Sequence, residues 1–141
     1  MELSRHPLII KLRSLHLPPH DYVVAGSGPL LAHGLRQDLG DLDVVARGEA
    51  WERVVTMAEP APASSGNGSV ITLYGGDIEV FDQWLPGTLP ADELIDGAEF
   101  IEGIPFCPLR TVLAWKIKFG RPKDHLDITL IKEYLAAHRS T

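Results

Sequence analysis

Two aspartates one residue apart, Asp41 and Asp43, are the side chains of this sequence best suited to chemistry. In an extended strand, residues i and i+2 point to the same face, so these two carboxylates would lie side by side. Neighbouring carboxylates repel each other, and a divalent cation relieves that repulsion. Magnesium is commonly held by a few carboxylates, with water and phosphate oxygens completing its shell. The Asp-Leu-Asp pattern therefore predicts a metal site, although the same pattern on an exposed edge strand could simply face solvent.

A turn of small residues precedes the aspartates. Gly26 and Ser27 follow an apolar run and come just before Pro29, a residue suited to the first turn of a helix. A strand-to-helix turn of this kind presents backbone N–H groups and a helix N-terminus to phosphates. By itself, a glycine-serine turn also serves to reverse the chain. Together with two carboxylates downstream, it predicts a site for a phosphate-bearing ligand.

The elements that must position these residues form an α/β (α+β) pattern, with a small mixed sheet and flanking helices. Strands are expected over residues 21–26, 41–46, 69–75 and 77–83. Helices are expected near Leu8 to Leu15 and over 29–35, 49–59, 108–120 and 122–138. The glycine pair 75–76 predicts a hairpin turn. Residues 84–107 are rich in turn formers, and only 98–103 within them suggests a strand.

The helix expected over 108–120 places a lysine on its apolar face. Helical spacing groups Lys116 with four apolar residues, namely Leu109, Val112, Leu113 and Ile117. A lysine in such a position either extends to water along its stem or finds an anionic partner. In the next helix, Asp124 and Asp127 share a face at i, i+3.

Length and composition limit the class of protein. With 141 residues, 45% hydrophobic and 23% charged, the chain is expected to form a single domain over 1–141, with a sheet core in 21–83 and carboxyl-terminal helices in 108–138. No apolar run approaches the roughly 20 residues that span a bilayer, so no membrane association is expected. A single cysteine allows no internal disulfide, and a cytoplasmic location is expected. The net charge of −6 argues against a surface that binds nucleic acid throughout, although residues 110–123 hold only basic charges.

Two segments together resemble the DNA polymerase β-type nucleotidyltransferase superfamily. The stretch VVAGSGPLLAHGLRQDLGDLDVVA is similar to its signature of an apolar residue and a Gly-Ser turn, followed about a dozen residues later by Asp-apolar-Asp. The residues at these motif positions are Gly26, Ser27, Asp41 and Asp43. The stretch VLAWKIKFGRPKDHLDITLI resembles the Lys, Arg, Lys-Asp, Asp pattern of small bacterial members, called minimal and AbiEii-like nucleotidyltransferases. Its matching residues are Lys116, Arg121, Lys123, Asp124 and Asp127.

The resemblance implies a site in which Asp41 and Asp43 hold Mg²⁺ or Mn²⁺ and a third carboxylate on a neighbouring strand completes the set. Glu79 ranks first because it lies between two apolar residues, as in the family, and Asp82 is the alternative. These three, Asp41, Asp43 and Glu79, are the expected catalytic and metal-binding residues. The expected phosphate-binding residues are Gly26, Ser27, Arg36, Lys116 and Lys123. Arg36 stands one residue further from Asp41 than the arginine of the family, and Trp84 is expected at the lip of the cleft.

The activity that the resemblance implies is transfer of a nucleoside monophosphate from a nucleoside triphosphate to an acceptor hydroxyl on RNA, a protein or a small molecule. Many members carry a larger helical domain that selects the acceptor, so a partner subunit or a second copy of this chain is expected to contribute here. Two other functions stay open. One is a non-catalytic protein of the same fold that acts as a nucleotide-binding or toxin-antitoxin partner, and the other is a two-metal phosphohydrolase.

Overall fold

Two runs rich in β-branched residues, Tyr22–Ala25 (β1) and Leu42–Ala46 (β2), form the centre of a mixed sheet. The fold was obtained as a computed structural model, which describes residues 3–138. β1 pairs antiparallel with β2, and their outer edges pair in parallel with two strands from later in the chain. These are Ile104–Phe106 (β7) beside β1 and Ile78–Phe81 (β5) beside β2.

Three further strands widen the sheet by antiparallel pairing. They are Ala61–Pro62 (β3), Ser69–Leu73 (β4) and Glu99–Ile101 (β6). The complete order is β3-β4-β5-β2-β1-β7-β6. The strands that carry the candidate residues, β2 and β5, therefore lie next to each other near the middle of the sheet.

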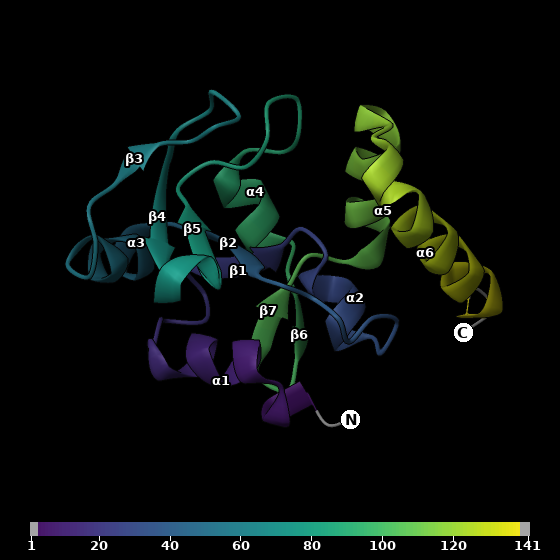
Figure 1. Cartoon of the computed structure of the whole chain (residues 1–141), viewed down its shortest axis with the longest axis horizontal. Helices are drawn as coiled ribbons and strands as arrows, with labels where there is room; N and C mark the ends of the chain where they lie inside the picture. Colours follow the sequence, from purple (N-terminus) through teal and green to yellow (C-terminus); the bar gives the residue numbers. More distant parts are fainter. Residues whose placement is uncertain (1–2, 139–141) are drawn as a thin grey trace.

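Helices cover both faces of the sheet. The helices are Pro7–Ser14 (α1), Gly28–Ala32 (α2), Gly48–Val55 (α3), Ala91–Asp96 (α4), Leu109–Phe119 (α5) and His125–His138 (α6), with short 3₁₀ turns at Leu3–Arg5, Tyr74–Gly76 and Pro122–Asp124. One core packs α1 and α3 against side chains such as Val24, Val44 and Val80. The other packs α4, α5 and α6 against the alternate residues, including Val23 and Val45. In the view of Figure 1, α1 lies at the bottom, α4 lies above β1 and β2, and α5 and α6 lie side by side at the right.

The predicted fold class, a mixed sheet with flanking helices, is confirmed. The predicted hairpin is also present: β4 and β5 pair antiparallel, with Leu73 opposite Ile78. Gly75 and Gly76 adopt φ angles of 67° and 107° in the connecting turn, a region that glycine enters without steric cost.

Several predicted boundaries were wrong. The helix expected over 49–59 ends at Val55, where the Thr56 hydroxyl donates to the Arg53 carbonyl and closes the last turn. The strand expected over 98–103 covers only 99–101, because Glu102 and Gly103 form a turn with φ angles of 51° and 80°. Three elements were not predicted, α4, β3 and β7. β3 and β7 are short and contain proline, which removes the usual strand signal.

No helix within residues 3–138 is long and apolar enough to cross a membrane.

Candidate metal and phosphate site

Strand register brings three carboxylates together. Asp43 on β2 is the direct parallel partner of Glu79 on β5, and Asp41 lies two residues before Asp43. One ligand oxygen from each of the three acids lies within 4.8 Å of the others. Alternation places the neighbouring Leu42 and Ile78 in the core on the opposite face. The acids are therefore gathered on the face of the sheet that the carboxyl-terminal helices cover.

Asp43 is the most strongly perturbed of the three. Burial, followed by the negative charges of Asp41 and Glu79, raises the pKa of Asp43 to about 7, despite the opposing charges of Lys116 and Lys123. Burial and the charge of Asp41 also raise the pKa of Glu79. Without a counter-ion the three carboxylates repel one another. Three carboxylates are also a donor set that fits a hard divalent cation.

The turn between β1 and α2 lies directly against these acids. Gly26 has a φ of 61°, and a Cβ atom built there would meet Asp43 Oδ2 at 2.7 Å. The backbone conformation favours glycine at position 26, and a side chain there would also displace the Asp43 carboxylate. The next residue, Ser27, immediately precedes α2, so the turn beside Asp43 leads directly into that short helix.

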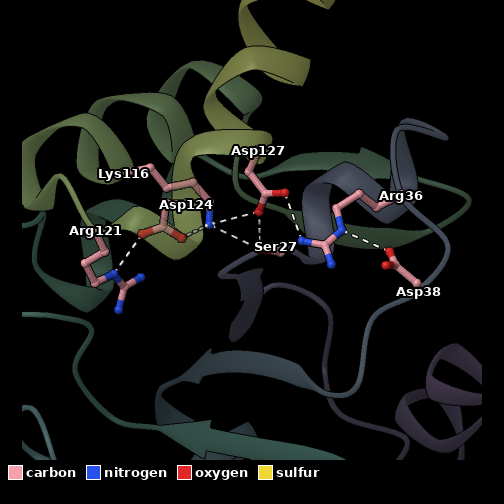
Figure 2. A network of polar contacts seen from close by, with 7 residues as sticks. All are labelled: Ser27, Arg36, Asp38, Lys116, Arg121, Asp124 and Asp127. Atoms are coloured by element: carbon pink, nitrogen blue, oxygen red, sulfur yellow. Dashed lines mark hydrogen bonds and ion pairs between the residues drawn. The ribbon is translucent and has the colours of Figure 1, made fainter.

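A buried ionic network connects this turn to the carboxyl-terminal helices (Figure 2). Ser27 Oγ donates to Asp127 Oδ2 at 2.7 Å. Lys116 Nζ donates to Ser27 Oγ at 3.1 Å and to Asp124 Oδ1 at 2.9 Å, and it lies 3.1 Å from Asp127 Oδ2. Lys116 is only 2% exposed, so its partners in the structure are these three side chains rather than water.

Two arginines extend the network at its ends, as Figure 2 shows. Arg36 Nη1 donates to Asp127 Oδ1 at 2.9 Å, and Arg121 Nε donates to Asp124 Oδ2 at 2.7 Å. Burial acts to raise the pKa of both aspartates, but hydrogen bonds and cations outweigh it and hold each pKa below its usual value. Both carboxylates are therefore charged at neutral pH.

The acids, the turn and the network line one cavity of about 370 Å³. The eight residues expected to bind metal or phosphate all line it: Gly26, Ser27, Arg36, Asp41, Asp43, Glu79, Lys116 and Lys123. Asp124, Asp127 and Arg121 line it as well. Lys123 is exposed, and its charge acts on Asp43 without an ion pair to any residue within 3–138. A cavity with acids on one wall and cations on the other can hold a metal together with an anionic group.

Three predicted positions were not confirmed. Asp82, the alternative third carboxylate, accepts the backbone N–H of Ser69 at 2.7 Å and does not line this cavity. Trp84 was expected at the lip of the cleft, but it is 5% exposed and packs against Phe81 and Trp115. Ile117 was expected to face inward and is instead 50% exposed, because the buried stripe of α5 runs through Trp115.

Three lining residues were not predicted: Leu39, Gly40 and Trp115. The first two directly precede Asp41, so their position in the chain was a signal that could have been used. For Trp115, the only signal in the sequence was its position next to Lys116. In the structure its ring lies 4.7 Å from Lys116 Nζ and 5.4 Å from Arg121 Cζ, in the range of cation–π contacts.

Comparison with models of known protein families found no match. Comparison with curated proteins also found none. Among solved structures, the chain is similar to a candidate nucleotidyltransferase from Thermotoga maritima, with 17% sequence identity and a TM-score of 0.58. The likeness covers 97% of this chain and 100% of that one. At this identity the comparison shows that the two proteins share a nucleotidyltransferase-like fold.

Proposed function

We propose that this chain is a metal-dependent nucleotidyltransferase that moves a nucleoside monophosphate from a nucleoside triphosphate to an acceptor hydroxyl. One observation carries the proposal: three carboxylates from adjacent parallel strands meet beneath the Gly26–Ser27 turn in a single cavity. The fold shared with the Thermotoga maritima protein supports it. The narrower assignment to minimal or AbiEii-like enzymes rests on the carboxyl-terminal motif alone.

Asp41, Asp43 and Glu79 would hold Mg²⁺ or Mn²⁺, which the three-carboxylate donor set and the mutual repulsion of these acids favour. Bound ions of this kind acidify a hydroxyl and neutralise phosphate charge. The Gly26–Ser27 turn would hold the phosphates through backbone N–H groups, and Lys123, without a carboxylate partner among the described side chains, would add a positive charge.

In the proposed reaction, an acceptor oxygen bonds to the α-phosphorus while the bond from that phosphorus to the bridging oxygen of pyrophosphate breaks. The hydroxyl proton is accepted by a carboxylate of the trio, and Glu79 serves either as that base or as a metal ligand. Arg36 and Lys116 face the cavity, where Asp127 and Asp124 hold their charged groups in place. The work of the protein is positioning and charge stabilisation.

The test is incubation with each α-³²P-labelled nucleoside triphosphate, Mg²⁺ or Mn²⁺, and separate pools of RNA, proteins and small hydroxyl compounds. We expect label on one pool, and Asp43→Asn should reduce transfer at least about a hundredfold because it removes a charged group at the reacting centre. Glu133→Gln, an exposed change on α6, is the matched control. Failure of the folded protein to bind nucleotide or metal would contradict the proposal.

The alternatives make different predictions in the same experiment. A phosphohydrolase releases labelled product by attack of water and labels no acceptor. A non-catalytic nucleotide-binding or toxin-antitoxin partner binds nucleotide without turnover. In a non-catalytic protein of this fold we would expect the third carboxylate to point away from the aspartates, whereas Glu79 lies with them, which favours the enzyme. A cytoplasmic location and a partner subunit or second copy that contributes to acceptor binding are also part of the proposal.

A further inference from the structure

A second cavity, of about 470 Å³, lies between the segment 84–89, α4 and α5. Its volume is in the range of small-molecule sites, roughly 300–1,000 Å³. Apolar side chains supply much of its wall, including Trp84, Leu94, Ala114 and Trp115. The rings of Trp84 and Trp115 are 5.8 Å apart and nearly perpendicular, so two indoles form one aromatic corner. The aromatic and apolar lining suits a ligand with a flat, apolar body.

The charged residues that line this cavity are all basic. Arg110 and Lys118 line it, and no Asp or Glu does. Arg110 is exposed and makes no hydrogen bond or ion pair with any other residue that the structure describes. Lys118 Nζ donates to the carbonyl of Gly87 at 2.7 Å and has no carboxylate partner there either. In a chain with a net charge of −6, an apolar cavity with two uncompensated cations is complementary to an anion.

Trp84, which lines this cavity, also carries a buried donor without a partner. Trp84 is 5% exposed, and its Nε1 is the one buried side-chain nitrogen or oxygen within residues 3–138 that has no hydrogen-bond partner. Such groups are rare because losing water without a replacement partner is costly. The nitrogen itself is out of contact with solvent, so a molecule in the cavity would contact the ring of Trp84 and not its N–H group.

We propose that this cavity binds a small organic anion with an apolar ring system, of the aromatic carboxylate class. The rings of Trp84 and Trp115 contact the body of the ligand, and Arg110 and Lys118 neutralise its carboxylate. Because Trp115 also lines the acidic cavity, the bound anion lies next to the candidate metal and phosphate site. The proposal does not depend on nucleotidyl transfer.

The probe for the test is naphthalene-2-carboxylate, with naphthalene-2-methanol as its neutral counterpart, titrated into the full chain by isothermal titration calorimetry. We expect the carboxylate to bind more tightly than the alcohol. Arg110→Gln should weaken the carboxylate roughly fivefold, the effect of one exposed charge contact, and leave the alcohol within about twofold. Lys132→Gln, an exposed lysine of α6 that does not line the cavity, should change neither affinity.

A second variant tests the location of the site. Ala114→Leu places a larger side chain in the cavity from an exposed position of α5, and it should weaken both probes at least about tenfold. Ala137→Leu makes the same change on the exposed face of α6 and should leave binding unchanged. Circular dichroism shows whether each variant is folded. The proposal is wrong if the wild-type chain does not bind the carboxylate, if the alcohol binds as tightly, or if folded Ala114→Leu binds like the wild type.

Discussion

Asp43 shows how burial and like charge act on one carboxylate. The pKa of Asp43 rises from an ordinary 3.8 to about 7 because the group is buried and faces Asp41 and Glu79. Between these two values the folded chain holds a proton that the unfolded chain has released, so stability falls as pH rises. This direction is opposite to that of a salt-bridged aspartate such as Asp127, whose pKa is lowered.

We therefore predict that the metal-free wild-type chain, kept in EDTA, loses stability between about pH 4 and about pH 7, and that Asp43→Asn removes this loss. At about pH 8 the variant should be more stable than the wild type by about 1–3 kcal/mol, and near pH 4 the two should agree. Urea unfolding across this range measures the difference. Parallel pH profiles for the two proteins would show that Asp43 does not titrate in this way.

Single residues also decide which acid is the third carboxylate of the metal site. Glu79 lies with Asp41 and Asp43, whereas the carboxylate of Asp82 accepts a hydrogen bond from the backbone N–H of Ser69. Glu79→Gln should weaken Mn²⁺ binding at least about tenfold, because it removes a charged ligand, whereas Asp82→Asn should change it less than twofold. Electron paramagnetic resonance of free Mn²⁺ during titration measures both affinities. An equal effect of the two substitutions would argue against the trio as the metal site.

At the scale of elements, the Lys116 network determines how α5 and α6 meet the turn before α2. Lys116 on α5 contacts Ser27 in that turn, Asp127 on α6 and Asp124 in the preceding 3₁₀ turn. Breaking such a buried ionic group by removing one member is costly, because the remaining charges stay buried without compensation. The network therefore positions Ser27 through the last two helices rather than through its own short helix.

Lys116→Met tests this coupling. It should lower the free energy of unfolding by about 3–5 kcal/mol, because Asp124 and Asp127, which are 3% and 1% exposed, lose a shared cation. Adding Asp127→Asn should recover part of that loss, since one uncompensated charge is then gone. Urea unfolding of both variants and of Asp127→Asn alone completes the double-mutant cycle. A loss below about 1 kcal/mol for Lys116→Met would contradict the importance of the network.

At the scale of the whole molecule, the two cores share one sheet. Alternate residues of β1 and β2 face α1 and α3 on one side and α4, α5 and α6 on the other. Neither set of helices can lose its packing without exposing strand residues that belong to the same hydrogen-bonded ladder. Cooperative unfolding of both faces follows from this arrangement.

Two matched substitutions, one on each face, check the cooperativity. Ile9 on α1 and Ile131 on α6 are both fully buried, so replacing either by alanine should lower the free energy of unfolding by about 2–5 kcal/mol. Both variants should unfold in one transition, with circular dichroism and tryptophan fluorescence changing together. A separate early transition in Ile131→Ala would show that the carboxyl-terminal helices form an independent unit.

Local patterns in the sequence were enough to predict the fold class, the β4–β5 hairpin and the pairing of Asp41 with Asp43. These follow from short-range physics: strand periodicity decides which face Asp41 and Asp43 share, and glycine decides where the chain can turn. Most other residues that line the acidic cavity were predicted only through the resemblance to a known superfamily, and Leu39, Gly40 and Trp115 were not predicted. The same logic failed where elements are short. α4 and β7 are held in place by contacts with the distant strand β1, β3 is a two-residue strand beside β4, and proline lies in or next to all three.

Only the tertiary structure decided which distant side chains meet. The pattern around Glu79 ranked it ahead of Asp82, but 35 intervening residues separate it from Asp43, so only the register of β2 against β5 shows that the two residues meet. The packing of α5 and α6 over the turn gives Lys116 its three partners and buries Trp84 away from the cleft. The sequence alone determined the chemistry that is present, and long-range packing determined which groups are close enough to act together.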